Sequence, residues 1–116
     1  MLTILVKKRF LEEIARGEKT REYRLAAGRY REEVFHVGRH VRFICEHRRI
    51  CGWVDVRVSN FTMAEAGKAD ADFATLQSVY PGIKSSDRLA LIDFEVLAVA
   101  RALRGAVADS LSAQAA

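Results

Sequence analysis

Three charged side chains in the first quarter of the chain have the types and spacing of a binding or catalytic site. They are Lys19, Glu22 and Arg24, within the stretch Gly-Glu-Lys-Thr-Arg-Glu-Tyr-Arg that begins at residue 17. If residues 20–25 form a strand, alternate side chains point to opposite faces, so Glu22 and Arg24 share a face with Lys19 close by at the turn. An ammonium and a carboxylate in a partly desolvated crevice could bind a polar base edge, polarise a carbonyl or orient a water molecule.

The same stretch also fits a purely structural role. A carboxylate and a guanidinium two residues apart on a strand often form an ion pair that only braces a bend. On the opposite face, Tyr23 and Leu25 are the pair that we expect to be buried. Gly17 predicts the end of a preceding helix, because glycine readily adopts the left-handed conformation of a helix C-cap. This cap would set the direction in which Lys19 points.

The stretch resembles the G-x-K-x-x-E-x-R signature of the ASCH domain family, with Gly17, Lys19, Glu22 and Arg24 at its four defined positions. The family's usual lead-in, an apolar strand, a lysine and a helix that ends at the glycine, is similar to residues 4–7 and 10–16.

A second segment adds to this resemblance, which covers about residues 2–97. Val37-Gly38 followed by Val41 and Phe43 resembles the family's V-G-D-x-V-x-F segment, with Arg39 in place of the usual acidic residue. The resemblance implies a small β-barrel similar to the PUA RNA-binding domain, with RNA or a nucleotide as the partner.

The resemblance implies that a cleft beside the motif at residues 17–24 serves either binding or catalysis. Some ASCH proteins resemble amidohydrolases that remove an acetyl group from a modified cytidine, and others are implicated as ribonucleases. In the amidohydrolase branch the catalytic residues are a lysine, a hydroxyl residue three positions later and a downstream glutamate. This chain keeps Lys19 but has Glu22 at the hydroxyl position, with Thr20 on the same face. Glu65 is a downstream acid at a similar spacing, so the candidate catalytic residues are Lys19, Glu22 and Glu65.

Basic and aromatic residues outside the motif could contact a phosphate backbone or stack on an unpaired base. Solvated turns and core aromatics are the ordinary alternative. The candidate RNA-binding or ligand-binding residues are Lys7, Thr20, Arg24, Tyr80, Arg48 and Arg49. A third class of function, a structural or partner-binding protein, is also open, since residues 96–103 could form a dimer contact.

Composition predicts one globular domain. The chain has 116 residues, half of them hydrophobic, and a net charge of +4, which is only a weak indication of nucleic-acid binding. Its apolar runs are too short for a membrane span, and the N-terminus lacks the pattern of a signal peptide, so we expect a cytoplasmic protein. Cys45 and Cys51 do not form a metal pattern; we expect free thiols on different faces of a hairpin. We expect no metal and no other cofactor.

Hydrophobic periodicity predicts an α+β fold, a small mixed barrel with two or three short helices. The predicted domain spans residues 1–104, and residues 105–116 form a tail that we expect to be mobile. The predicted strands are residues 2–6, 20–25, 40–46, 50–60 and 89–97. Helical patterns occupy residues 9–16 and 73–79, with a helical turn or two at 30–35 and a loop or frayed helix at 62–72.

Overall fold

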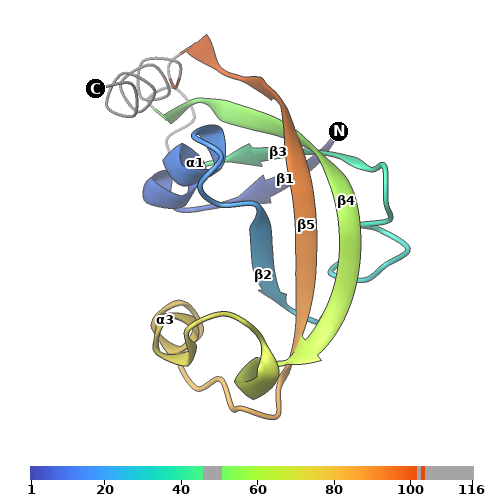
Figure 1. The fold of residues 1–116 in the computed structure, drawn as a ribbon, viewed down its shortest axis with the longest axis vertical. Coiled ribbons are helices and arrows are strands. Elements are labelled where there is room, and N and C mark those ends of the chain that lie inside the picture. The colour runs from blue at the N-terminus through green and yellow to red at the C-terminus, as the bar shows by residue number, and fades with distance from the viewer. Residues whose placement is uncertain (46–50, 102, 104–116) are drawn as a thin grey trace.

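The computed structural model describes residues 1–45, 51–101 and 103. Its elements follow the predicted order (Figure 1). They are β1 (Leu2–Leu5), α1 (Lys8–Ala15), β2 (Arg21–Leu25), β3 (His40–Ile44), β4 (Trp53–Glu65), the 3-10 helix η1 (Ala66–Lys68), α3 (Phe73–Val79) and β5 (Arg88–Val99). The predicted helical turn at residues 30–35 is present as one isolated turn, in which the Val34 and Phe35 N–H groups donate to the Arg31 carbonyl at 3.1 and 3.0 Å. The predicted tail, residues 105–116, lies outside the described residues.

The five strands form one curled sheet with the order β1-β3-β4-β5-β2. β1 runs parallel to β3, and the other neighbours are antiparallel. β1 and β2 are therefore the two edges, and the sheet is a half-barrel because no strand pairing joins them. The predicted α+β fold of about five strands with short helices is confirmed, with the barrel open along one side.

α1 ends where the glycine predicted it would. Gly17 has a φ of 77°, a conformation that costs a glycine little. The Gly17 N–H donates to the Ile14 carbonyl at 3.1 Å, and the Glu18 N–H donates to the Glu13 carbonyl at 2.9 Å. These two bonds form a Schellman motif, which satisfies the last carbonyls of the helix. The chain then turns directly into β2, which places the charged stretch beside the start of the helix.

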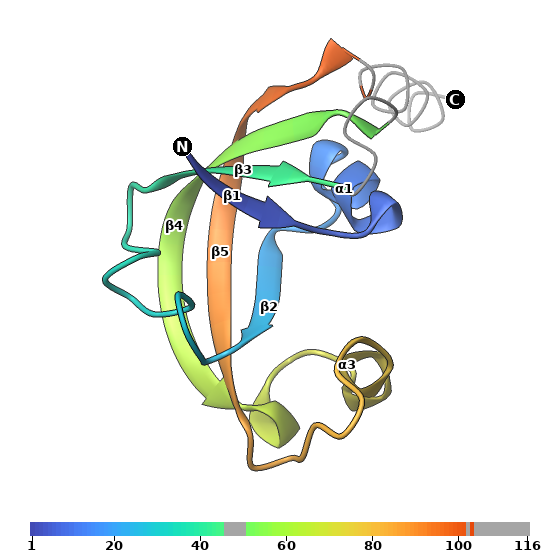
Figure 2. The same ribbon diagram turned by 180° about the vertical axis from the view of Figure 1, so that it is seen from behind.

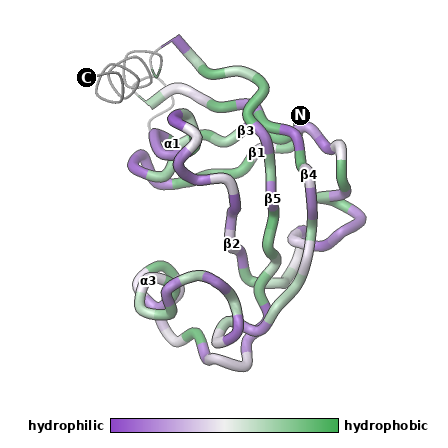
Figure 3. Tube along the Cα trace, in the orientation of Figure 1, coloured by the Kyte–Doolittle hydropathy of each residue, from purple (hydrophilic) through white to green (hydrophobic). Residues whose placement is uncertain are grey.

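β4 is longer than predicted, and it replaces part of the expected loop at residues 62–72. Register with β5 shifts between Asp55 and Val56 and again between Val58 and Asn60. After these shifts the strand continues to Glu65, paired with Arg88. The sequence pattern hid this extension because a bulge changes which residues face inward. β5, the strand that pairs with β4, has hydrophobic stretches that hydrophilic residues interrupt (Figure 3).

The hydrophobic core is divided into two clusters. The larger one packs α1 against the sheet, with Leu11, Ile14 and Phe43 among its members. The smaller one lies beneath α3 and contains Leu76 and Leu89. α1 and α3 lie toward opposite ends of the curled sheet, and β2 lies between them (Figures 1 and 2).

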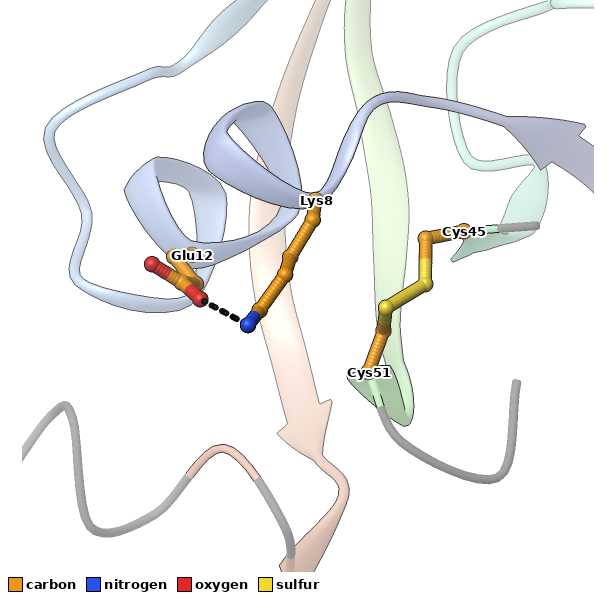
Figure 4. The surroundings of a disulfide bond; sticks show 4 residues. All are labelled: Lys8, Glu12, Cys45 and Cys51. Carbon is orange, nitrogen blue, oxygen red and sulfur yellow. Dashed lines mark ion pairs between the residues drawn. A yellow bond between two sulfur atoms is a disulfide. The ribbon is translucent and has the colours of Figure 1, made fainter. Parts of the chain in front are cut away.

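Cys45 and Cys51 form a disulfide, with their Cα atoms 6.1 Å apart (Figure 4). The prediction of free thiols on different faces is therefore wrong. Side-chain parity failed here because Cys45 follows the end of β3 and Cys51 precedes β4, so neither continues a regular strand. Both side chains are buried, with 2% and 3% of their surface exposed, and both belong to the larger core cluster.

Arginine side chains cross the open side of the half-barrel. Arg24 on β2 donates from Nη2 to the Leu5 carbonyl at 2.7 Å. Arg29 donates from Nη2 to the Thr3 carbonyl at 2.8 Å. These bonds satisfy two carbonyls of edge strand β1 that have no strand partner there. Among the described helices, none has the length and apolar character needed to cross a membrane.

Candidate functional site

A cavity of about 330 Å³ lies at the open side of the half-barrel, between the β1–α1 turn, β2 and α3. We call it the Glu22 cavity. Its volume is at the lower end of the range for small-molecule sites, about 300–1,000 Å³. The residues that line it are Leu5, Val6, Lys7, Phe10, Lys19, Glu22, Tyr23, Arg24, Ala71, Asp72, Thr75, Leu76, Val79 and Tyr80.

Glu22 is the one charged side chain buried in the described residues, with 7% of its surface exposed. Its Oε1 atom accepts a hydrogen bond from the Tyr23 N–H at 3.0 Å. Its Oε2 atom is buried and accepts no hydrogen bond from any described residue. Burying a carboxylate oxygen without a donor is costly, so such an atom in a cavity wall is suited to bind a donor on a ligand.

Two cations lie on either side of this carboxylate. The Lys19 Nζ atom is 3.8 Å from Glu22 Oε1, and the Arg24 Nη2 atom is 3.7 Å from Glu22 Oε2. Both separations allow electrostatic attraction but exceed hydrogen-bond distance. The Nε atom of Arg24 is also buried and has no hydrogen-bond partner in residues 1–45, 51–101 and 103. The wall of the cavity therefore contains a buried acceptor on Glu22 and a buried donor on Arg24, and neither has a hydrogen-bond partner among the described residues.

Aromatic rings form much of the remaining wall. The Lys19 ammonium lies 5.3 Å from the centre of the Phe10 ring and 5.4 Å from that of Tyr23. The Tyr80 hydroxyl donates to the Tyr23 carbonyl at 3.1 Å. Burial is the main reason that the pKa of Tyr80 is raised; Arg24 opposes this shift in the pKa and Glu22 adds to it. Flat rings beside a donor and an acceptor suit a planar polar ligand such as a nucleobase.

A second hollow, of about 630 Å³, lies on the other side of Lys19 and Tyr23. We call it the Asp93 hollow; its other lining residues are Glu13, Glu18, Thr20, Arg21, Ser59, Asp70, Asp93 and Phe94. Arg21 donates to both oxygens of Asp93 and to Asp70, and Tyr23 donates to Asp70 at 2.7 Å. The hydrogen bond to Asp93 is the main reason that the pKa of Arg21 is raised.

The structure brings together most of the sequence-predicted site residues. Five line the Glu22 cavity: Lys7, Lys19, Glu22, Arg24 and Tyr80. Thr20 lies in the Asp93 hollow instead. Glu65 ends β4 outside both, with its carboxylate 3.5 Å from the Lys68 ammonium. Arg48 and Arg49 lie outside the described residues.

The prediction that Tyr23 and Leu25 are a buried pair is wrong, since Tyr23 is only half-buried and 36% of the surface of Leu25 is exposed. Glu22 is the buried residue of β2 instead. The reason is that β2 is an edge strand, so the α1 turn and α3 enclose one side of it while the end at Leu25 stays open.

Sequence reasoning missed the contribution of α3. Thr75, Leu76 and Val79 line the cavity, whereas the sequence indicated only a short helix face. Their spacing predicts the helix, but no local signal joins a helix at residue 73 to a motif at residue 22. In the part of the chain that the structure describes, no group of His, Cys, Asp and Glu side chains is arranged to hold a metal ion.

The sheet, its open side and the charged cavity define a small α+β half-barrel. No family model matches the sequence, and no curated protein matches it. Solved structures do match. The fold is similar to that of the hypothetical protein PH0355, with a TM-score of 0.57 and 15% identity over 83% of this chain and 98% of that one.

Two structures of ZmASCH from Zymomonas mobilis are also similar. A serine-to-alanine mutant matches with a TM-score of 0.61 and 9% identity over 86% of this chain and 72% of that one. A tyrosine-to-phenylalanine mutant matches with a TM-score of 0.57 and 9% identity over 84% of this chain and 73% of that one. This chain therefore has an ASCH-type fold, as the resemblance implied.

Proposed function

We propose that this protein binds RNA or a nucleotide, and that one unpaired base enters the Glu22 cavity. The observation that carries this proposal is the buried Glu22 carboxylate with an unpaired oxygen in the wall of the cavity. A base brings ring or exocyclic N–H groups to such an acceptor and carbonyl or ring nitrogen atoms to Lys19 and Arg24. The ASCH-type fold, which resembles the PUA RNA-binding domain, supports the same partner.

The test is RNA binding by the Glu22→Gln variant, measured by fluorescence anisotropy with a labelled single-stranded RNA of mixed sequence. Glutamine keeps the shape of the side chain but replaces a charged acceptor by a neutral amide. We expect the affinity to fall about tenfold or more, the usual effect of weakening one hydrogen bond to a charged group.

Glu95→Gln is the matched control. It makes the same chemical change at a carboxylate on β5 that is 55% exposed, paired with Arg57 and absent from the cavity wall. We expect wild-type affinity for this variant. Equal affinities for both variants and the wild type would remove the cavity from RNA binding. Circular dichroism checks that both variants are folded.

A second candidate function is hydrolysis, of RNA or of an acetylated cytidine. It is favoured by the separation of 3.8 Å between the Lys19 ammonium and the Glu22 carboxylate in the cavity. In amide hydrolysis, Glu22 takes a proton from the attacking water and returns it to the leaving amine, while Lys19 stabilises the negative charge that develops on the carbonyl oxygen. Water supplies both the hydroxyl and the proton of the products.

Incubation of the protein with total RNA and with acetylated cytidine tests this second candidate. Mass spectrometry would detect RNA fragments or free cytidine, and turnover should be lost in Lys19→Ala and Glu22→Gln. Glu65→Gln decides whether the predicted downstream acid takes part. If there is turnover and neither cavity variant changes it, the activity lies elsewhere.

A further inference from the structure

The first turn of α1 forms part of the wall of the Glu22 cavity, and this end of the helix is uncapped. Lys7 is the N-cap residue, with an extended backbone and no side-chain capping bond, and the first turn contains no acidic residue. The first helical hydrogen bond runs from the Leu11 N–H to the Lys7 carbonyl at 3.0 Å. The N–H groups of residues 8–10 donate to no described backbone group. Lys7 and Phe10 both line the cavity.

The charges at this end of the helix are positive. Lys8 lies 3.9 Å from Glu12 and points along the helix toward it (Figure 4). Arg9 lies over the Phe10 ring, 4.6 Å from its centre. Lys7 makes no ion pair with any described residue. Free N–H groups and the positive end of the helix dipole together favour an anion such as phosphate.

A second and independent observation in the same cavity indicates what else the ligand must carry. The Glu22 side chain is nine-tenths buried, and its Oε2 atom has no donor among the described residues. This atom can accept a hydrogen bond from an N–H group of a ligand, and its negative charge repels a phosphate. A ligand with both groups must therefore place its phosphate away from Glu22, toward the wall formed by Lys7 and the start of α1.

We propose that the cavity recognises a nucleotide rather than a nucleoside. The base gives an N–H to Glu22, and the phosphate accepts from the N–H groups of residues 8–10 and from the Lys7 ammonium. This inference rests on the proposed function, because it assumes that a base occupies the Glu22 end. The phosphate is either the terminal group of a mononucleotide or a phosphodiester of an RNA strand. Both groups are anions that accept hydrogen bonds, so the site would bind them by the same contacts.

Calorimetric titration tests the inference with the four nucleosides, their 3′- and 5′-monophosphates and dinucleoside monophosphates as probes. For whichever base binds, we expect the phosphate-bearing probe to bind about fivefold or more tightly than its nucleoside, the size of a favourable helix-terminus interaction. The difference should shrink with added salt. The dinucleoside arm distinguishes a phosphodiester from a terminal phosphate.

Amide NMR spectra locate the phosphate. The phosphate-bearing probes should shift the amide resonances of residues 8–10, and the nucleosides should not. Equal affinity for nucleoside and nucleotide, or unmoved resonances in the nucleotide complex, would overturn the inference and leave base binding in place. The affinity of each probe for Glu22→Gln is compared with its affinity for the wild type. If no probe binds the wild type more tightly than this variant, the proposed function fails, and the inference fails with it.

Lys7→Asp gives a sharper test of the same contact. An aspartate at the N-cap accepts hydrogen bonds from the N–H groups of the first turn, which stabilises the helix. The aspartate carboxylate then occupies the proposed phosphate site, and the charge of residue 7 changes from positive to negative. We expect this variant to lose the preference for the nucleotide. Lys68→Asp, at a side chain that is 79% exposed and outside the cavity, makes the same change in net charge and should keep the preference. Equal preference in both variants would contradict the contact.

Discussion

The two hollows on either side of Lys19 and Tyr23 differ in how their charges are paired. In the Asp93 hollow, Arg21 donates to both oxygens of Asp93 and to Asp70, and Asp70 also accepts from Tyr23. In the Glu22 cavity the two ion pairs are longer than hydrogen bonds. An acceptor on Glu22 and a donor on Arg24 have no partner there within the described residues.

This difference separates two uses of charge on one short strand. Arg21 and Glu22 are sequence neighbours, so their side chains leave β2 in opposite directions. Arg21 meets carboxylates of its own fold, which makes it a structural residue. Glu22 lies beyond hydrogen-bond distance of its two cations and lines a cavity with aromatic walls, so its remaining hydrogen-bonding capacity is available to a ligand. Unpaired buried groups, rather than the number of charges, therefore distinguish the Glu22 cavity from the Asp93 hollow.

The largest effect that we expect is a change in the free energy of unfolding, and it should differ between the walls of the two hollows. Leu76 lines the Glu22 cavity, is 4% exposed and belongs to the α3 core cluster. Leu76→Ala should lower the free energy of unfolding by about 2–5 kcal/mol, the usual cost of truncating a buried leucine. Ser59 lines the Asp93 hollow and is exposed, so Ser59→Ala should change it by less than about 0.5 kcal/mol. Urea unfolding measures both, and similar losses would contradict this contrast.

An intermediate effect should follow from breaking the paired charges. Asp93→Asn removes the charge that accepts both bonds from Arg21, and we expect a loss of about 1–3 kcal/mol in the free energy of unfolding. RNA affinity should stay within about twofold of the wild type, whereas Glu22→Gln weakens it. Urea unfolding and fluorescence anisotropy on the same preparations measure the two quantities. A loss of affinity in Asp93→Asn equal to that in Glu22→Gln would abolish the distinction between structural and functional charge.

The smallest effect concerns Tyr23, which is shared by the two hollows. Burial, followed by the hydrogen bond to Asp70, raises the pKa of Tyr23 from 10.0 to about 12, while Arg21 opposes the shift. The unfolded chain therefore loses this proton first as the pH rises. The stability contributed by the neutral phenol is complete below pH 10 and disappears between pH 10 and about 12.

Urea unfolding across this range measures the contribution of Tyr23. Tyr23→Phe should show a smaller decrease in the free energy of unfolding than the wild type, because phenylalanine does not titrate. Tyr30→Phe is the matched control, since it removes a phenol outside both hollows and should keep the wild-type decrease. An unchanged decrease in Tyr23→Phe would mean that other groups cause it.

Local patterns predicted the elements well but their surroundings poorly. The helix that ends at Gly17 and the helix at residues 73–79 depend on spacing and on a glycine, so they are visible in the sequence. The extension of β4 to Glu65 depends on bulges and on pairing with β5, which the polar residues of that segment do not indicate. The Cys45–Cys51 disulfide depends on where two strand ends meet, and parity along a single strand cannot predict it.

Some features of the candidate site could likewise be predicted from local patterns, and others could not. The spacing of Lys19, Glu22 and Arg24 around one bend predicted that they would lie together, because side-chain direction along a short segment follows from the backbone. Lys7 was predicted as a binding residue from the family resemblance and Tyr80 as an aromatic ring that could stack on a base, but only the structure places both beside the triad. Thr20 lies in the other hollow, however, and Leu25 is exposed, because the enclosure of an edge strand is decided by distant segments.

The sequence by itself determined the order of the elements, the helix cap and the triad of charges at the bend, because these follow from neighbouring residues. Only the tertiary structure decided that α3 closes over β2, that Glu22 rather than Leu25 is buried, and that its Oε2 atom lacks a donor in the described chain. The reason is physical: burial and hydrogen-bond pairing are properties of the whole packed chain, whereas periodicity is a property of a few consecutive residues.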